Sequence, residues 1–300
     1  MIIDLPDTTT VELNAELLKL RKEGGVITVG RVMTLVIDAT EADVDEAITT
    51  ANIASREHPC RIIVLSPHVD GRRLDGQIRV GGDAGASEVI VLRPSLDAME
   101  HADTLITPFL LPDAPIVVWW AGVVPLVPAA TGIGAMAQRR ITDTKISQTP
   151  SAVLCSLADG YTAGDTDLAW SRVTRWRALL ASALEQVPDQ RVTKARIHGD
   201  LNSPSILLLG AWLRRTLGCE FEATYDREAT GLVSVCLDTP SGVISIVRPD
   251  GLNATLSQPG QPAHVIALPA RTAGECLTEE LRRMDDDPVY GDALQQVAHC

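Results

Sequence analysis

Two β-branched runs with a helical segment between them constrain the fold more than any other feature of the sequence. Residues 32–37 and 61–65 are apolar runs rich in Val and Ile, which is typical of buried strands. The segment between them repeats Val44, Ile48 and Ala51 at helical spacing. A strand, a helix and a second strand form the unit that joins parallel strands, so we predict an α/β domain with a largely parallel sheet. Further strands are predicted at 77–80, 88–92 and 116–120, and a helix at 96–107.

The second half of the 300-residue chain has a different pattern. A long helix is predicted to start at Asp165 or Thr166, with an apolar stripe that runs from Ala169 to Leu184. Helices at 203–218 and 272–285 and short strands at 232–237, 243–248, 254–257 and 264–268 are predicted to complete this half. With 143–150 as a polar linker, we expect an α/β domain at 1–145 and an α+β domain with an antiparallel meander at 146–300.

The charge balance excludes one class of partner. Asp and Glu total 39 against 26 Lys and Arg, which gives a net charge of −13. Proteins that bind nucleic acid need a basic surface to neutralise phosphates, so no nucleic-acid partner is expected.

The cysteines and the amino-terminal residues indicate the compartment. The six cysteines are scattered without any C-x-x-C pair, so we expect reduced thiols and no metal site built from them. The first residues lack the basic and apolar regions of a signal peptide. A cytoplasmic location is therefore expected.

One uncharged segment raises the question of a membrane span. Residues 114–138 carry no charge, but Pro115, Pro125 and Pro128 interrupt them. A lone helix in lipid would leave the broken backbone hydrogen bonds unsatisfied. We predict a buried strand at 116–120 followed by an apolar loop, and no membrane span.

The search for catalytic and cofactor motifs gives no assignment. Residues 132–137 match G-x-G-x-x-A, but no strand directly precedes the first glycine and no acid follows at the required distance. Residues 80–85 are glycine-rich without the Lys-Ser or Lys-Thr of a phosphate loop and predict a turn between strands. The acidic cluster at 38–46 lacks the pattern of a calcium loop, and its carboxylates are expected mostly at a helix start. We therefore expect no catalytic residue, no bound cofactor and no metal.

Tryptophan and arginine residues suggest a surface for a protein partner. Both types are enriched among residues that dominate interface energies. They gather where the apolar loop begins and ends and on the long helix, where Arg172 and Arg175 are expected to share a face. The candidate interface residues are Trp119, Trp120, Arg139, Arg140, Trp170, Arg172 and Arg175. The alternative is that the tryptophans fill the core and the arginines pair with nearby acids.

Longer strings distributed over nearly the whole chain point to a family. They include LPDTTT (5–10), GRVMTLV (30–36), ASREHPCR (54–61), QIRVGGDAG (77–85), AQRRITD (137–143), GDTDLAW (164–170), RPDG (248–251) and ATLSQPGQP (254–262). In these strings the sequence resembles the glucose-6-phosphate dehydrogenase assembly proteins of the OpcA type, especially those of actinobacteria.

The resemblance implies a function that composition and spacing do not. A member of this family is expected to be a non-catalytic assembly factor or allosteric activator. It would bind glucose-6-phosphate dehydrogenase and support NADPH production in the oxidative pentose phosphate pathway. The alternative is an α/β protein or enzyme that binds a phosphorylated sugar or nucleotide through the glycine-rich turns and the junction at 56–61.

Overall fold

The computed structural model describes residues 1–23, 30, 32–68, 74–81, 88–186 and 191–297. Two units are distinguishable, and each combines two segments of the chain. The first unit contains Met1–Thr142 and Ala273–Asp286, and the second contains Asp143–Thr272 and Asp287–Cys300. The expected division into domains at 145 and 146 stays a prediction, because independent folding of the two halves is untested.

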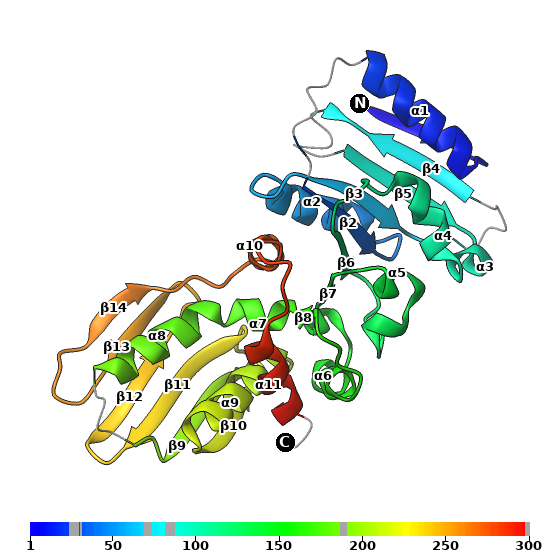
Figure 1. Ribbon diagram of the computed structural model, residues 1–300. Coiled ribbons are helices and arrows are strands. Elements are labelled where there is room, and N and C mark those ends of the chain that lie inside the picture. Colours follow the sequence, from blue (N-terminus) through cyan, green and yellow to red (C-terminus); the bar gives the residue numbers. More distant parts are fainter. Residues whose placement is uncertain (24–29, 31, 69–73, 82–87, 187–190, 298–300) are drawn as a thin grey trace. The chain divides into compact units, whose positions relative to one another are not determined.

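The sheet of the first unit forms where the β-branched runs predict it (Figure 1). Seven strands of an eight-stranded sheet belong to this unit, in the order β1-β4-β5-β3-β2-β6-β7. The strands β5, β3, β2, β6 and β7 pair in parallel, whereas β4 and β1 join one edge by antiparallel pairing. The bounds are β1 Ile2–Leu5, β2 Met33–Asp38, β3 Cys60–Leu65, β4 Leu74–Arg79, β5 Glu88–Pro94, β6 Ile116–Trp120 and β7 Arg139–Thr142. The predicted α/β unit with a largely parallel sheet is confirmed.

Helices of different lengths connect these strands. The helix α1 (Thr10–Glu23) lies between β1 and β2 in sequence, and α2 (Val44–Ser55) connects β2 to β3. The helix predicted at 96–107 is wrong as a single element. It forms the short pieces α3 (Leu96–Met99), α4 (Ala102–Ile106) and η2 (Thr107–Phe109), because His101 between them has a non-helical ψ of 35°. The connection from β6 to β7 contains η3 (Pro128–Ala130) and α5 (Gly132–Ala135).

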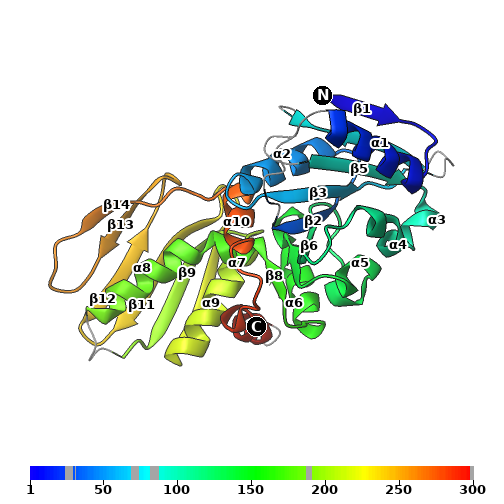
Figure 2. The same cartoon turned by 45° about the horizontal axis from the view of Figure 1, so that its top comes forward.

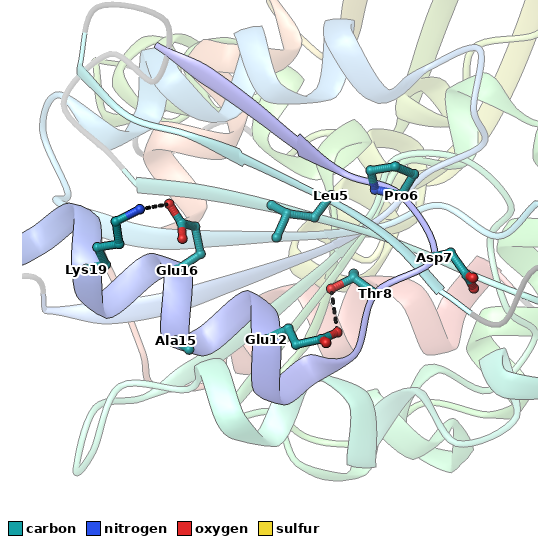
Figure 3. Close-up of a pocket in the computed structure, with 8 residues that line it drawn as sticks. All are labelled: Leu5, Pro6, Asp7, Thr8, Glu12, Ala15, Glu16 and Lys19. Atoms are coloured by element: carbon teal, nitrogen blue, oxygen red, sulfur yellow. Dashed lines mark hydrogen bonds and ion pairs between the residues drawn. The ribbon is translucent and has the colours of Figure 1, made fainter.

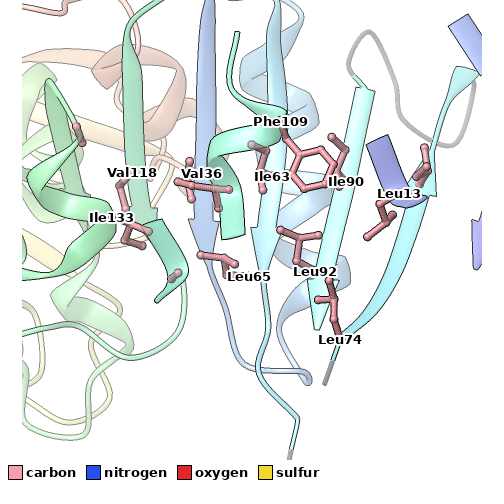
Figure 4. Packing of buried hydrophobic residues seen from close by; sticks show 14 of the residues in the cluster. Leu13, Val36, Ile63, Leu65, Leu74, Ile90, Leu92, Phe109, Val118 and Ile133 are labelled. Carbon is pink, nitrogen blue, oxygen red and sulfur yellow. The ribbon is translucent and has the colours of Figure 1, made fainter. Parts of the chain in front are cut away.

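Both faces of the parallel sheet are buried, as expected for strands with continuous apolar runs. On one face, alternate strand residues such as Val36, Ile63 and Val118 pack with Leu13 of α1 and Phe109 of η2 (Figure 4). The intervening strand residues point to the other face and are also buried, among them Leu35, Ile37, Ile62, Val64 and Val117. This packing explains why β2 and β3 show no polar alternation in the sequence.

The start of α1 confirms a local prediction. The spacing Thr9-x-x-Glu12 is that of a capping box, in which two side chains satisfy the free N–H groups of a helix start. The Thr9 main-chain N–H donates to Glu12 Oε2 at 3.0 Å, and the Glu12 N–H donates to Thr9 Oγ1 at 3.2 Å. The bonds are reciprocal, so residues close in sequence supply the cap of this helix start.

The second unit contains a six-stranded sheet in the order β10-β9-β11-β12-β13-β14. The neighbours β9 and β10 are parallel and are connected by α9, and the other pairs are antiparallel. Figures 1 and 2 show α8 and α9 on the same face of this sheet. The bounds are β9 Lys194–Asp200, α9 Pro204–Leu217, β10 Glu220–Asp226, β11 Leu232–Thr239, β12 Gly242–Val247, β13 Asn253–Ser257 and β14 His264–Ala267. The predicted α+β unit with an antiparallel meander is confirmed.

The long helix of the second half is predicted incorrectly. Residues 165–167 form a short strand, β8 (Asp165–Asp167), and the helix is divided into α7 (Leu168–Arg172) and α8 (Thr174–Glu185). Val173 separates them, with a φ of −102° and a ψ of 5°. The polar segment 143–150 is also not a free linker, because it contains η4 (Thr144–Ile146) and leads directly into α6 (Pro150–Asp159).

The last two helices of the chain belong to different units. The helix α10 (Ala273–Glu280) belongs to the first unit, where it packs against α2. The helix α11 (Pro288–Val297) belongs to the second unit and packs against α6 and α9. The predicted helix at 272–285 is therefore shorter than expected, and α11 was not predicted.

The apolar segment at 114–138 is the place where a membrane span was considered. It contains β6, η3 and α5 rather than one continuous helix. Among the described residues, no helix combines the length and the apolar character that crossing a bilayer requires.

Candidate functional site

The carboxyl ends of β2 and β6 form the first candidate site. In the parallel part of the sheet the strand order reverses between these two strands, and ligands of such sheets bind at the carboxyl ends next to the reversal. Asp38 ends β2 and lies opposite Trp120, which ends β6. The Ala121 and Gly122 N–H groups donate to the Asp38 carbonyl at 2.8 and 3.2 Å. These bonds fix the chain where it leaves the sheet.

The Asp38 carboxyl group faces a crevice of about 290 Å³. Apolar side chains such as Met99, Trp120 and Ile133 line this crevice. No hydrogen bond or ion pair within the described ranges reaches the Asp38 carboxylate. Burial alone therefore raises the pKa of Asp38 from its ordinary value of 3.8 to about 6. A carboxyl group with such a pKa in a cleft is a candidate functional group, and no motif in the sequence indicates it.

The loop that follows Trp120 is apolar and partly exposed. Val123 is 75% exposed, Leu126 62% and Val127 40%. Close packing explains why residue 122 is glycine, because a Cβ there would lie 2.9 Å from the Thr40 main-chain nitrogen. The predicted strand and apolar loop are both present, and the loop presents three apolar side chains to solvent.

The glycines at 132–134 serve chain packing rather than a nucleotide. The segment belongs to α5, and residues 121–131 separate it from the end of β6. A Cβ on Gly134 would lie 1.9 Å from the Pro128 carbonyl oxygen. The close approach of two chain segments therefore explains this glycine. Residues 82–87 of the other glycine-rich turn lie outside the described residues.

The junction at 56–61 lies at the amino end of β3. Ligands of parallel sheets bind at the opposite, carboxyl ends of the strands. Glu57 forms an exposed ion pair with Arg282 at 3.0 Å. The arrangement gives the junction a structural contact within the first unit.

The two arginines at the end of the apolar segment are buried in the first unit. Arg139 is 2% exposed, and its Nη2 donates to Glu280 Oε2 of α10 at 2.6 Å. Arg140 is 6% exposed, and its Nη1 donates to the Ala137 carbonyl at 2.8 Å. Arg139 thereby attaches α10 to β7, and Arg140 holds the end of the apolar segment.

The tryptophan and arginine residues of α7 and α8 form a second cluster, within the second unit. The Trp170 ring is buried, and its Nε1 donates to Asp287 Oδ2 at 2.8 Å. The Arg177 guanidinium lies 3.5 Å from the centre of this ring, a cation–π contact. Arg172 forms two hydrogen bonds with the Asp143 carboxylate, at 2.7 and 2.6 Å. These contacts connect α7 with the first residue of each of the unit's two segments.

The candidate interface residues are thus mostly internal. Trp119, Trp120, Arg139, Arg140 and Trp170 are at most 6% exposed. Arg172 precedes the break at Val173 and Arg175 follows it, so the two do not share the face of one helix. Arg175 is exposed. A role of these residues in an interface stays a prediction.

A further hollow lies beside the start of α1 (Figure 3). It is wide and open, with a volume of about 550 Å³. Thr8 Oγ1 donates to Glu12 Oε2 at 3.2 Å, and Lys19 Nζ pairs with Glu16 Oε1 at 3.3 Å. These two contacts engage four of the polar side chains that line the hollow.

Metal sites and disulfides are absent from the part of the chain that the structure describes. No group of three His, Cys, Asp or Glu residues there is placed to hold an ion. Of the acidic cluster at 38–46, Asp45 and Glu46 lie in the first turn of α2, while Glu41 pairs with Arg93 at 2.9 Å. None of the five described cysteines forms a disulfide.

Comparison with protein families matches most of the chain, from residue 51 onward. Residues 51–159 match the family described as the N-terminal domain of the glucose-6-phosphate dehydrogenase subunit. Residues 163–294 match the C-terminal domain of the same glucose-6-phosphate dehydrogenase subunit. The chain belongs to the OpcA family of glucose-6-phosphate dehydrogenase assembly proteins. This confirms the resemblance that the sequence strings indicate.

Two curated OpcA proteins, which carry the provisional name OxPP cycle protein OpcA, are among the relatives. The protein of Synechocystis sp. is 30% identical over 47% of this chain and 32% of its own length. The protein of Synechococcus elongatus is 26% identical over 60% of this chain and 44% of its own length. The matches therefore span less than half of these OpcA relatives.

Solved structures also show similarity at low sequence identity. An oxidoreductase from Sinorhizobium meliloti is 11% identical, with a TM-score of 0.46 over 89% of this chain and 95% of that chain. A protein provisionally assigned as a myo-inositol dehydrogenase from the same species is 14% identical, with a TM-score of 0.39 over 88% and 94% of the two chains.

Proposed function

We propose that this chain is a non-catalytic partner of glucose-6-phosphate dehydrogenase. It would assist assembly of that enzyme or activate it allosterically, and so support NADPH production in the oxidative pentose phosphate pathway. Membership of the OpcA family supports the proposal, because both matched domains are described as parts of a glucose-6-phosphate dehydrogenase subunit. The proposal also keeps the expected cytoplasmic location.

The structural observation that carries the proposal is the exposed loop 121–127. Its three exposed apolar side chains, Val123, Leu126 and Val127, lie together in sequence next to the buried strand β6. Grouped exposed apolar side chains are typical of surfaces that bind another protein. Since the loop is fixed to the Asp38 carbonyl at its start, it would lose little conformational entropy on binding.

Activation requires only a modest preference for one form of the enzyme. A partner that binds the active form ten times more tightly than the inactive form shifts the equilibrium by about 1.4 kcal/mol. Burial of apolar surface stabilises by about 25 cal/mol per Å², so a contact difference of less than about 100 Å² is sufficient. The loop is large enough to supply such a difference.

The first experiment is a titration of purified dehydrogenase with this chain. We expect a change in the dehydrogenase's activity or oligomer size that saturates, while the chain alone reduces no NADP. If neither quantity changes over the titration, the proposal is wrong.

A matched pair of variants then locates the contact. We expect Val123→Asp to weaken dehydrogenase binding at least tenfold, because it places a charge on the apolar loop. Val265→Asp is the control, since Val265 of β14 is a valine of nearly equal exposure, 76%, in the second unit. Equal affinity of the Val123→Asp variant and the unmodified chain would exclude the loop. A loss that occurs only with Val265→Asp would place the contact on the second unit.

A further inference from the structure

A small cavity within the second unit is lined by positively charged side chains. It has a volume of about 150 Å³ and lies where the start of α9, the break between α7 and α8 and the end of β12 meet. Lys145, Arg172, Arg248 and Arg271 line it, together with one carboxylate, that of Asp200. Arg172 pairs with the Asp143 carboxylate, and the Asp250 carboxylate acts on Arg248. Lys145 and Arg248 nevertheless form no ion pair with a described residue, and these two cations attract an anion.

Arg248 is the central residue of this cavity. It is 5% exposed, and its guanidinium nitrogens donate to the Leu268 carbonyl at 3.0 Å and the Leu232 carbonyl at 2.8 Å. Carbonyl oxygens carry no net charge, so these bonds position the guanidinium without neutralising it. The Trp176 ring, 5.1 Å from the guanidinium, supports it from one side.

Arg248 forms no ion pair with a described residue, although the nearby Asp250 carboxylate favours its charged form. Its Nε is buried and has no hydrogen-bond partner in the described part of the chain. Burial lowers the pKa of Arg248, which indicates that desolvation of its charge is not fully offset. A buried charge that no adjacent counter-ion neutralises is costly, and a bound anion would reduce that cost.

The start of α9 adds uncharged donors. Ser203 precedes the helix, is 8% exposed and lines the cavity, yet its hydroxyl makes no capping hydrogen bond. A 14-residue helix carries partial positive charge at its first turn, although Pro204 there has no N–H and the Ile206 N–H already donates to the Ser203 carbonyl at 3.1 Å. The carboxylate of Asp200 is oriented by the Asn202 N–H at 2.9 Å. Phosphate groups commonly bind at such helix starts.

We propose that this cavity binds one small oxyanion of the phosphate type, either free or as the end group of a phosphorylated metabolite. Pockets for whole drug-sized ligands usually have volumes of about 300–1,000 Å³. A cavity of about 150 Å³ therefore fits a single group rather than a nucleotide. Arg248 would form a charge-assisted bond to the anion, and Lys145 and the Ser203 hydroxyl would donate to it. The inference does not depend on the dehydrogenase.

The test uses the full chain alone, with thermal unfolding and calorimetric titration at constant ionic strength. Inorganic phosphate and glucose 6-phosphate are the probes, and chloride and glucose are the controls. We expect saturable binding of at least one phosphate compound and none of the controls. Binding of both compounds indicates recognition of the end group, and binding of phosphate alone indicates the free anion. The proposal is overturned if neither compound gives a saturable response.

Variants show whether the binding is at this cavity. We expect Lys145→Ala to weaken phosphate binding about tenfold, because it removes one charge-assisted contact. Lys194→Ala is the matched control, since Lys194 is a lysine of β9 that pairs with Glu222 in the same unit. Arg248→Lys keeps the charge but loses the carbonyl contacts, and far-UV circular dichroism checks that it folds. Equal affinity in the Lys145→Ala and Lys194→Ala variants would place the anion elsewhere and contradict the proposal.

Discussion

Asp38 shows how a single residue can be important without a visible motif. In sequence it is one of several acids between 38 and 46, and we expected these mainly at a helix start. In the structure, Asp45 and Glu46 occupy the first turn of α2, whereas Asp38 ends β2 and faces the apolar crevice. Its neighbours in the crevice come from distant segments of the chain. The sequence therefore predicted the residue's position at the end of a strand, but not its desolvation.

Replacement of Asp38 tests this desolvation. The folded pKa of about 6 exceeds the ordinary value of 3.8, so ionisation of Asp38 opposes folding above pH 6. Asp38→Asn removes the ionisation, and we expect it to raise the free energy of unfolding at pH 7.5 by about 2–3 kcal/mol. The gain should diminish between pH 6 and pH 4 and be absent below pH 4, where the unmodified carboxyl is protonated in both states.

Chemical denaturation from pH 3.5 to pH 8 measures the effect. Asp286→Asn, at an exposed position of the same unit, serves as the control and should change little over this range. A gain that is the same at pH 3.5 and pH 7.5 would show that the amide acts by packing rather than by removal of charge.

At the scale of elements, the sequence predicted those helices and strands whose burial produces a regular pattern of apolar residues. The strands β2, β3, β5 and β6 are buried on both faces, so their β-branched runs predicted them. The edge strand β10 carries alternating charges and exposed residues, and its pattern did not differ from that of a loop. The break at Val173 separates two segments that share one apolar stripe, so periodicity alone could not reveal it. The cavity around Arg248 unites residues far apart in sequence, which no local pattern shows.

The contact between α9 and β10 is a further test at this scale. A Cβ on Gly210 would lie 2.3 Å from the ring of Phe221, so the helix can pack this closely only with glycine. Gly210→Ala should lower the free energy of unfolding by about 1–3 kcal/mol, although alanine favours the helix intrinsically. Thermal unfolding measures the loss.

A second substitution, Phe221→Leu, tests whether a steric clash causes the loss of stability in Gly210→Ala. Adding Phe221→Leu to Gly210→Ala should recover part of the stability, because it removes the ring that the new methyl group contacts. Additive losses in the double variant would contradict the proposed contact. Arg215→Ala, on the exposed side of the same helix, is expected to change the stability by less than about 0.5 kcal/mol.

At the scale of the whole molecule, the helix α10 accounts for the main difference between the predicted domains and the observed units. The predicted boundary at 145 and 146 assigns α10 to the second half, whereas α10 packs on α2 in the first unit. The buried pair Arg139–Glu280 and the close contact of Gly274 with Ile53 belong to this packing. A fragment of residues 1–145 would therefore lack the helix that packs on α2.

We expect fragment 1–145 alone to be less stable than the same residues within the full chain. Loss of a buried partner of Arg139 by itself costs about 3–5 kcal/mol. Denaturation followed by circular dichroism compares the two, and a synthetic peptide of residues 270–287 should restore stability. If the fragment without the peptide is as stable as the same residues in the full chain, α10 contributes little. That result would favour the two predicted domains as independent units.

The division of the last helices between two units also affects how the chain folds during synthesis. A ribosome adds residues in order, so α1 and the strands β1 to β7 emerge well before α10. At about 5–20 residues per second, synthesis of the segment from Asp143 to Asp286 takes roughly 7–30 s. During that interval the surface of α2 that α10 covers stays open to other chains and to chaperones. The first unit would thus reach its final form only after residue 286 has been translated.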